Sequence, residues 1–403
     1  DQHIREGVAV ADGFVPKALH QKLVNQIDRL KDTQIEDYHP HSNNVVRDIV
    51  HPALYSYVKE VSPLLKTQGE IEALSYDPQI KESDRIELKA LDYWGRPYEA
   101  SSKYQWLPTY FSINDDGAVS ITDYINNLVP RSEHEELYAS LAGLFAQALP
   151  LIESVYGYCR VVKENHIRIE DYDELDYDDA SLEEIEEVPV SLRGEELQVV
   201  TKIVDYELGP GDEYDGVWHV EGMSHEEIVA TAIYFIDRDD EVKGGDLLFK
   251  RAFHRREAEY IFSSVDQIRP PMVENSIREG LQPLGTVQTP KGRLVVFPNS
   301  HVHKVTKLHY EAPKKSQEDA SKESHPDSSN ENCSGKKKRR IVVFFLINPE
   351  RRIISTREVP VQQEHAGGSM TRAEAMEHRL ELMKERKFAK QDWNVREIKL
   401  CEH

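Results

Sequence analysis

Four short runs rich in β-branched and aromatic residues, each next to turn-forming residues, place the strongest constraint on the fold. They are residues 228–237, 244–249, 292–299 and 339–348. Runs of this composition and length are typical of β-strands. Several such strands separated by turns favour an antiparallel barrel or jelly roll. The sequence therefore predicts that the core of the protein is built from antiparallel strands.

A candidate metal site accompanies these runs. His219 and Glu221 are two residues apart, so on an extended segment their side chains point to the same side. His301 and His303 follow the third run and could supply a third ligand. Two imidazoles and one carboxylate leave three adjacent positions open on a metal, as in non-haem Fe(II) oxygenases. An isolated H-x-E is more often a solvated histidine beside an exposed glutamate, and the neighbouring strands are what favour the metal site.

The order of the motifs resembles the double-stranded β-helix of the Fe(II)/2-oxoglutarate oxygenases, and most closely its prolyl-hydroxylase-like branch. This order is H-x-E, G-G-x-L-x-F, G-R-L-V-V-F-P-N, H-x-V and an Arg that opens an apolar strand. Further motifs resemble a fungal and plant family catalogued only as a domain of unknown function. They include Y-Q-W-L-P at 104–108, Y-I-N-N-L at 124–128, L-R-G at 192–194 and W-H-V-E-G-M at 218–223. The resemblance spans residues 45–363.

This resemblance implies that His219, Glu221 and His303 bind Fe(II) and form the catalytic centre. The family pattern favours His303, because a charged residue and then Val follow it. His301 remains the alternative, since it would point to the same side of an extended segment. A Glu in place of the commoner Asp still supplies a carboxylate and reaches one methylene further.

The co-substrate that the resemblance implies, 2-oxoglutarate, needs a cation for its distal carboxylate. A guanidinium matches a carboxylate with two hydrogen bonds and keeps its charge. The resemblance favours Arg339, which lies nine residues before Asn348 at the end of the strand. Arg340 would point the opposite way on that strand. The alternative is that both arginines belong to an exposed basic run at 336–340.

If Arg339 points inward, strand alternation predicts a mostly apolar pocket wall. Some residues of this wall are expected to be ordinary core. The expected members are Thr231 and Phe235 for the co-substrate, beside Arg339, and Ile233, Ile341, Val343 and Phe345 for the substrate.

The implied reaction oxidises an unactivated C–H bond while 2-oxoglutarate and O₂ become succinate and CO₂, with ascorbate added in vitro. The small apolar wall favours a small-molecule substrate. The sequence is similar to fungal valine-oxidising, aziridine-forming oxygenases of secondary metabolism, so an aliphatic amino acid such as L-valine is expected. Hydroxylation and oxidative cyclisation are both possible outcomes. Two alternatives remain: a protein prolyl or lysyl hydroxylase, and a non-catalytic, cupin-like metal-binding protein.

Composition restricts the partners. The 403-residue chain has a net charge of −22, which argues against nucleic-acid binding, because phosphate contacts need clustered Lys and Arg. Its three cysteines show no pairing pattern, as expected in a reducing compartment. We find neither a run of 18 apolar residues nor a signal peptide. We therefore expect a cytoplasmic protein with no membrane partner. Its oligomeric state is not predicted.

The predicted fold class is α+β with three regions. Residues 1–160 are expected to be mainly helical, residues 161–363 to form the catalytic β-core, and residues 364–403 to form a C-terminal helix. The segment 312–338 is rich in Ser, Lys, Glu and Asp. Because such a composition cannot bury a core, we expect it to be a disordered insertion.

Apolar spacing predicts where individual elements lie. Helices are expected at 16–32 and 132–156, and one or two strands at 187–208. Thr371 followed three residues later by Glu374 is a capping-box pattern, which predicts that the C-terminal helix begins there.

Overall fold

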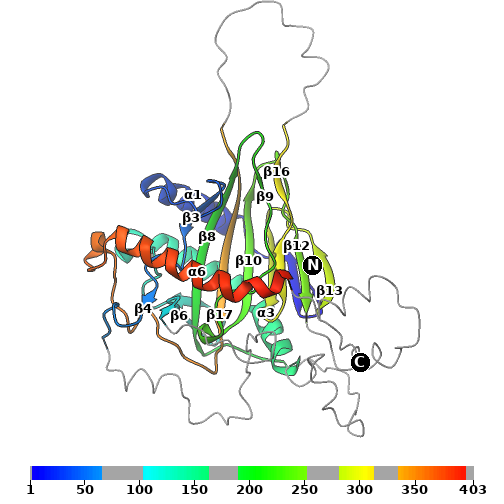
Figure 1. Cartoon of the computed structure of the whole chain (residues 1–403). Coiled ribbons are helices and arrows are strands. Elements are labelled where there is room, and N and C mark those ends of the chain that lie inside the picture. The colour runs from blue at the N-terminus through cyan, green and yellow to red at the C-terminus, as the bar shows by residue number, and fades with distance from the viewer. Residues whose placement is uncertain (1, 66–102, 163–188, 252–280, 313–334, 396–403) are drawn as a thin grey trace, which may run out of the picture.

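The computed structural model describes residues 2–65, 103–162, 189–251, 281–312 and 335–395. These residues form a mixed α/β structure, shown in Figure 1, in which paired strands run antiparallel. Its helices are α1 (Lys17–Thr33), α3 (Glu135–Val162) and α6 (Arg372–Val395), and its 3-10 turns are η2 (Arg131–Glu133), η5 (Ser224–Glu226) and η7 (Glu364–Ala366).

A nine-stranded sheet forms the centre of the molecule. The strands follow the order β1-β2-β14-β10-β17-β8-β6-β7, and β3 also pairs with β8. In that order they are β1 (Gln2–Arg5), β2 (Val8–Asp12), β14 (Arg293–Pro298), β10 (Ile228–Arg238), β17 (Lys337–Ile347), β8 (Glu196–Leu208), β6 (Thr109–Ile113), β7 (Val119–Ile121) and β3 (Val46–Val50).

Smaller antiparallel sheets accompany the large one. One has the order β11-β16-β9, another β13-β12-β15, and β4 pairs with β5. Their strands are β11 (Val242–Gly244), β16 (Leu308–Tyr310), β9 (Glu213–Tyr214), β13 (Gln282–Val287), β12 (Leu247–Arg251), β15 (Val302–Val305), β4 (Tyr57–Val58) and β5 (Tyr104–Gln105).

The two faces of the large sheet pack against different partners, because successive strand residues point to opposite sides. On β10, Tyr234 belongs to a buried cluster that includes Leu23 of α1 and Phe145 of α3. Its neighbour Ile233 belongs to a second cluster, which includes Phe249 of β12. We call the first face the outer face and the second the inner face. The inner face therefore borders an interior shared with the smaller sheets.

Helix α6 packs against the inner cluster through Ala375 and Leu382, and Figure 1 shows it in red across the large sheet. The predicted capping box is confirmed at its start. The backbone N–H of Thr371 donates to the Glu374 carboxylate at 2.8 Å, and the N–H of Glu374 donates to Oγ1 of Thr371 at 3.3 Å. This pair fixes where the chain turns into α6.

The periodic segments were predicted well. The helices expected at 16–32 and 132–156 are α1 and α3, and the four β-rich runs are β10, β12, β14 and β17. The run expected at 187–208 contains one long strand, β8. The strands alternate regularly and the helices are long, so local pattern was enough to predict these elements.

Residues 1–160, predicted to be mainly helical, contain short strands as well as helices. This region does hold α1 and α3, but β1, β2, β3, β6 and β7 belong to the same large sheet as the core strands. These strands have five residues or fewer. Most of the predicted insertion at 312–338 lies outside the described residues, but Lys337 and Lys338 begin β17 and are not disordered.

Helix α3 is long and apolar enough to cross a membrane by length and composition alone, but 61% of its most apolar stretch is buried inside the protein. Its residues Leu141, Phe145 and Ile152 belong to the cluster on the outer face of the large sheet. A buried core helix passes the same test, so the composition of α3 does not indicate a membrane partner.

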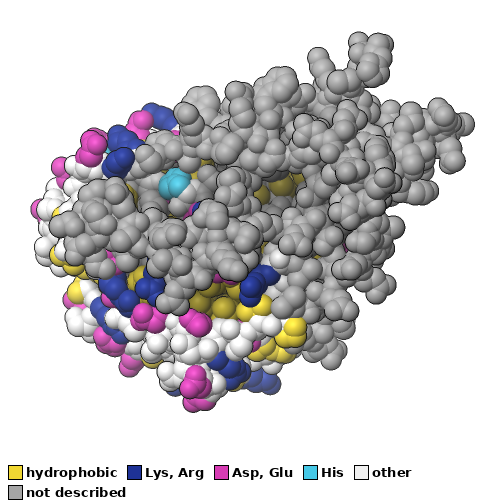
Figure 2. Space-filling model, turned by 90° about the horizontal axis from the view of Figure 1, so that it is seen from below, with side chains coloured by type: hydrophobic (Ala, Val, Ile, Leu, Met, Phe, Trp, Pro, Cys, Tyr) yellow, Lys and Arg dark blue, Asp and Glu magenta, His cyan; other side chains and the backbone are white. Residues whose placement is uncertain are grey.

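On the face seen in Figure 2, charged side chains of both signs lie among the described residues. In the view from below, hydrophobic side chains lie between basic and acidic ones (Figure 2). The exposed large hydrophobic residues are scattered over different elements, namely Ile35, Val61, Leu65, Val217 and Leu380.

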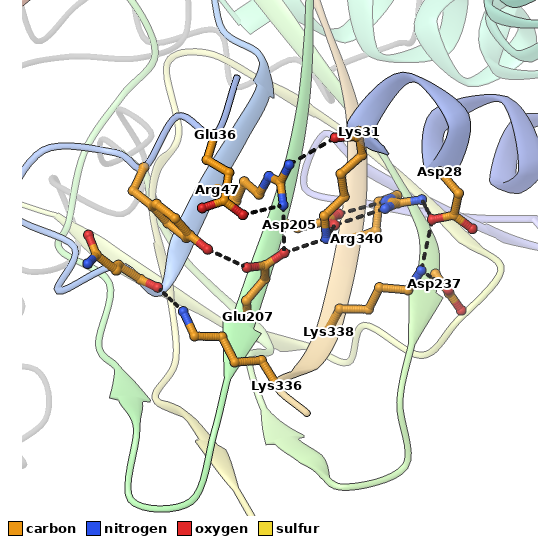
Figure 3. A network of polar contacts seen from close by, with 12 residues as sticks. Asp28, Lys31, Glu36, Arg47, Asp205, Glu207, Asp237, Lys336, Lys338 and Arg340 are labelled. Atoms are coloured by element: carbon orange, nitrogen blue, oxygen red, sulfur yellow. Dashed lines mark hydrogen bonds and ion pairs between the residues drawn. The ribbon is translucent and has the colours of Figure 1, made fainter. Parts of the chain in front are cut away.

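A network of ion pairs ties α1 to the outer face of the sheet (Figure 3). Arg340 of β17 donates to both carboxylate oxygens of Asp205 on β8, at 2.6 and 2.8 Å, and to Asp28 of α1 at 2.8 Å. Lys31 of α1 also donates to Asp205 at 2.9 Å. Arg340 is fully buried, so its role is to join the layers and not to face solvent.

Replacing Arg340 with Met is expected to destabilise the protein by about 3 kcal/mol near neutral pH, because Asp205 would stay buried with Lys31 alone. Burial favours a raised pKa for Asp205, but Arg340 and Lys31 lower it below its ordinary value. Its stabilisation is thus complete above the unfolded pKa of about 3.9 and is lost as pH falls through the lower folded pKa.

Urea unfolding of wild type and Arg340→Met at several pH values tests this. The difference in unfolding free energy should shrink as the pH falls through about 4, where Asp205 becomes protonated in the unfolded chain. A difference that stays constant over this range would show that Asp205 is not the group left uncompensated.

Candidate metal centre

Three predicted side chains meet at one point of the interior. The possible ligand atoms of His219, Glu221 and His303 all lie within 4.8 Å of one another. Oε1 of Glu221 is 3.5 Å from Nε2 of each histidine. The two imidazole rings are 4.3 Å apart between centroids. This is a compact set of two nitrogen donors and one oxygen donor, which suits Fe(II) and leaves room for further ligands.

The backbone brings the two histidines together. The N–H of His219 donates to the carbonyl of His303 at 3.0 Å, and the N–H of His303 donates back to His219 at 2.9 Å. On its other side, β15 pairs His303 with Phe249 of β12. The H-x-E segment is therefore held against a strand that is itself part of a sheet.

The orientation of each ring is also set. Nδ1 of His219 donates to the carbonyl of Val217 at 2.7 Å, which leaves the lone pair of Nε2 for a metal. The ring of His303 packs against Phe297, with 4.7 Å between ring centroids. Burial lowers the pKa of His303 to about 4, so its imidazole is neutral at ordinary pH. A neutral imidazole is the form that binds metals.

Glu221 is held as a carboxylate. Burial alone would raise its pKa, but the neighbouring imidazoles of His219 and His303 lower the pKa of Glu221 well below its usual range. The three side chains thus offer one carboxylate and two imidazoles, which is a donor set expected for a divalent cation.

Asn299 holds the backbone at Glu221. Its Oδ1 accepts from the N–H of Glu221 at 2.9 Å, and its Nδ2 donates to the carbonyl of Glu221 at 2.9 Å and of Ile228 at 3.2 Å. Asn299 is the last residue of the G-R-L-V-V-F-P-N motif, and the motif alone assigns it no role. It is a positioning residue, because it fixes the loop that carries a candidate ligand.

Replacing Asn299 with Ala is expected to weaken metal binding by about 10- to 100-fold, as for other residues that orient a ligand. Replacement with Asp keeps an acceptor for the N–H of Glu221, so the metal affinity should fall less than in Asn299→Ala. Anaerobic titration with Fe(II) measures both. Equal Fe(II) affinity of wild type and Asn299→Ala would show that the hydrogen bonds of Asn299 are not needed to position Glu221.

His301 lies apart from this centre. Its Nε2 donates to the carbonyl of Glu6 at 2.7 Å, and its ring meets Tyr158 edge to face at 6.1 Å. The N–H of His301 closes a turn onto the carbonyl of Pro298, and β15 begins only at the next residue. Strand alternation therefore does not apply to His301, which explains why the sequence left both histidines open.

Arg339 is a buried cation, 1% exposed. Its Nη2 donates to the carbonyl of Gly245 at 2.8 Å and to Oγ1 of Thr289 at 2.9 Å. Nε and Nη1 are buried and have no hydrogen-bond partner among the described residues, and no described carboxylate pairs with it. Burial lowers the pKa of Arg339 to about 10, so it still carries its charge at neutral pH.

A buried guanidinium without a counter-ion is unfavourable unless a ligand supplies the negative charge. The unused Nε–H and Nη1–H groups of Arg339 can each donate to a ligand oxygen, although they lie on different edges of the guanidinium and do not form a two-hydrogen-bond fork. Gly245 keeps this space open, because a Cβ there would lie 2.8 Å from Nη1 of Arg339, and its φ of +82° suits glycine.

Arg340 points to the outer face, so alternation separated the two arginines as expected. The alternative of two exposed arginines was wrong.

All six expected wall residues face the interior. Five belong to the inner cluster, and Thr231 is paired in register with Phe297 and Phe345, both of that cluster. Its hydroxyl is buried without a hydrogen-bond partner among the described residues. The five clustered residues are Ile233, Phe235, Ile341, Val343 and Phe345. Their individual roles with ligands stay predictions.

The amino-acid sequence alone did not assign Tyr206 or Tyr214 to this interior, and it favoured an ordinary packed loop over a place beside the active site for the aromatic-rich segment 104–108. Tyr206 pairs in register with Arg339, and its ring lies 5.1 Å from that of Tyr214. Trp106 packs on Phe345 with 5.5 Å between ring centroids. Alternation along β8 was the available signal for Tyr206, whereas Tyr214 and Trp106 come from segments without a regular pattern.

A second group of possible ligands, His39, Asp48 and His51, does not fit a metal. Arg379 of α6 already pairs with Asp48 and donates to Asp37 at 2.8 Å, so a cation is present. Nδ1 of His51 accepts the N–H of Ala53 at 3.2 Å, which places the ring proton on Nε2. This group instead anchors α6 to β3.

Helix α6 also reaches the loop after the H-x-E segment. Arg386 donates to the fully buried carboxylate of Glu226 at 2.5 Å. The same carboxylate accepts the N–H groups of Trp106 at 2.6 Å and Met223 at 2.8 Å. The helix therefore supports both the metal loop and the tryptophan of the interior wall.

A family model described as a protein of unknown function (DUF4246) matches residues 2–191 and 184–318. No curated protein matches the chain.

Several solved structures share low similarity with the chain. The IDO structure from Bacillus thuringiensis has a TM-score of 0.21 at 13% identity and covers 38% of this chain, which spans 47% of that protein. A Trichoplax adhaerens prolyl hydroxylase, in complex with a hypoxia inducible factor peptide fragment, has a TM-score of 0.30 at 8% identity, and the match covers 85% of this chain and 86% of that one. An oxidoreductase of the 2OG-Fe(II) oxygenase family from Burkholderia pseudomallei has a TM-score of 0.20 at 11% identity, and the match covers 40% of this chain and 48% of that one. These scores are too low to carry an argument.

Proposed function

The chain belongs to the DUF4246 family, whose description states no function, and we propose that it is an Fe(II)/2-oxoglutarate-dependent oxygenase. One observation carries this proposal. A buried Arg339 with two unused donors faces the same interior as His219, Glu221 and His303. A ligand that satisfies both features has a carboxylate at one end and metal-binding oxygens at the other, as 2-oxoglutarate does.

One segment of chain links the two features. Gly245, which accepts from Arg339, lies two residues before β12 begins at Leu247, and Phe249 of β12 pairs with His303. The guanidinium and the candidate metal ligands are therefore positioned by the same segment of chain. In this proposal one diacid bridges them. We also infer that the large sheet and the smaller sheets on its inner face form a double-stranded β-helix.

In this proposal His219, Glu221 and His303 hold Fe(II), which when bound supplies the redox chemistry with O₂ that an organic side chain cannot. Arg339 binds and orients the distal carboxylate of 2-oxoglutarate. Phe235, whose ring centroid lies 4.9 Å from Cζ of Arg339, and the buried hydroxyl of Thr231 are further co-substrate contacts in this proposal. The aromatic rings around His303 exclude water from the centre.

We propose a small aliphatic substrate, with L-valine as the first candidate and with hydroxylation or oxidative cyclisation to an aziridine as the outcome. The support is the apolar wall formed by Ile341, Val343 and Phe345, which Trp106 extends. Such a wall would hold an isopropyl group and direct one C–H bond toward the metal. A role in secondary metabolism follows only from this substrate.

Anaerobic titration of the protein with Fe(II) and 2-oxoglutarate tests the proposed function. The expected result is a visible charge-transfer band that needs both reagents and is lost in His219→Ala. His225→Ala is the matched control, since His225 lies in the same loop but donates to the carbonyl of Tyr104. Folded protein that binds Fe(II) and shows no band with 2-oxoglutarate would refute the proposal.

A further inference from the structure

Lys202 stands out on the inner face of the large sheet. It lies on β8, where its register partner is Val343 of β17, and Val343 belongs to the inner cluster. Two residues away on either side, Val200 and Val204 belong to the same cluster. Strand pairing therefore places the side chain of Lys202 in the interior, where it is only partly exposed.

The ammonium group of Lys202 has no hydrogen-bond or ion-pair partner among the described residues. Other partly buried lysines of this protein do have partners. Lys31 donates to Asp205 at 2.9 Å, and Lys338 donates to Asp28 at 3.1 Å. An interior lysine without a carboxylate partner is uncommon. It is therefore a candidate for binding an anion that enters the site.

Lys202 shares its face of the sheet with the predicted substrate wall. Its register partner Val343 lies two residues before Phe345 on β17, and both belong to the inner cluster. Trp106 packs on Phe345 with 5.5 Å between ring centroids. Lys202 therefore lies on the side of the sheet that carries the apolar wall.

Lys202 is separate from the site of Arg339. Tyr206, the register partner of Arg339, lies four residues further along β8, which corresponds to roughly 13 Å of strand. One cation binding the distal carboxylate of 2-oxoglutarate leaves the other without an anion. A single ammonium suits a singly charged carboxylate better than a phosphate, which normally needs several cations.

We propose that Lys202 binds the carboxylate of the organic substrate, so that the substrate class is small aliphatic carboxylic acids, amino acids included. This rests on the proposed function, because it assigns Lys202 to the substrate and Arg339 to the co-substrate. With its carboxylate held at Lys202, an aliphatic chain would lie along Val343 and Phe345. That placement would direct a C–H bond near the far end of the chain toward Glu221 and the metal.

The test measures binding and not turnover. Calorimetric titration of the full chain, anaerobically and with Fe(II) and 2-oxoglutarate present, uses L-valine, 3-methylbutanoate and the matched neutral amide 3-methylbutanamide. The proteins are wild type, Lys202→Met, Lys202→Arg and the control Lys243→Met, whose lysine is exposed on β11. The Met side chain keeps the length of Lys without its charge, and thermal melting shows whether each variant is folded.

Wild type is expected to bind both acids and to bind the amide more weakly. Lys202→Met should weaken acid binding by about 10- to 100-fold, as for loss of a hydrogen bond to a charged group, and leave the amide unchanged. Lys202→Arg should retain most of the acid affinity, and Lys243→Met all of it.

Three outcomes would overturn the proposal: equal acid affinity in Lys202→Met and wild type, equal affinity of wild type for acid and amide, or no binding of either acid by wild type. The 2-oxoglutarate band in the same samples separates this result from the proposed function. A band that persists while acid binding fails refutes only the role of Lys202. Without a band in wild type the oxygenase proposal fails, and acid titration of the metal-free protein still decides the role of Lys202.

Discussion

Replacing Arg339 with Met is expected to weaken 2-oxoglutarate binding by about 100-fold or more without destabilising the fold. In the protein as described, Arg339 is buried, has no carboxylate partner and leaves two donors unused. The guanidinium is therefore a cost to the folded state in the absence of ligand. Its removal should change the unfolding free energy by less than about 1 kcal/mol, or raise it.

Arg340→Met is the matched control, because it removes the same side chain from the neighbouring residue on the opposite face. It should lower stability through Asp205 and leave 2-oxoglutarate affinity nearly unchanged. Chemical unfolding and anaerobic titration of the charge-transfer band measure the two properties separately. If Arg339→Met unfolds easily and still gives the band, Arg339 has a structural role, and the co-substrate site must lie elsewhere.

The contrast between these two arginines shows what local sequence can predict. A strand period of two places neighbours on opposite faces, and that rule separated Arg339 from Arg340 once β17 was identified. The same rule placed Ile233 and Phe235 on the inner face. Long strands with regular patterns therefore carried most of the fold and the predicted pocket wall.

Features that depend on distant contacts were not predictable in this way. The short strand β3 is defined by pairing with β8, and its own five residues gave no local signal for it. Arg379 and Asp48 meet only because α6 returns to β3. Lys202 lies on a strand that was expected, but its lack of a partner could be recognised only after every neighbouring strand was in place.

At the metal centre, local sequence left His301 and His303 open as the third ligand, and replacing His303 is the second change for which we expect a large effect. His303→Ala is expected to weaken Fe(II) binding by more than the roughly 100-fold that follows loss of a residue orienting a ligand. One of the three donors would be missing, and Glu221 would lose one of the two imidazoles 3.5 Å from its carboxylate. The unfolding free energy of the metal-free protein should change less than the Fe(II) affinity, because Phe297 and Phe249 still fill most of the space around residue 303.

His301→Ala is the matched control, because His301 is two residues away and equally buried. It should leave Fe(II) affinity within the error of the wild-type value. It should instead lower the unfolding free energy by about 1–3 kcal/mol, because the carbonyl of Glu6 loses its hydrogen bond in a buried setting. Anaerobic Fe(II) titration and chemical unfolding of both variants distinguish the two histidines. Loss of metal binding in His301→Ala with retention in His303→Ala would mean that the third ligand is His301 and that the turn at Pro298 rearranges when metal binds.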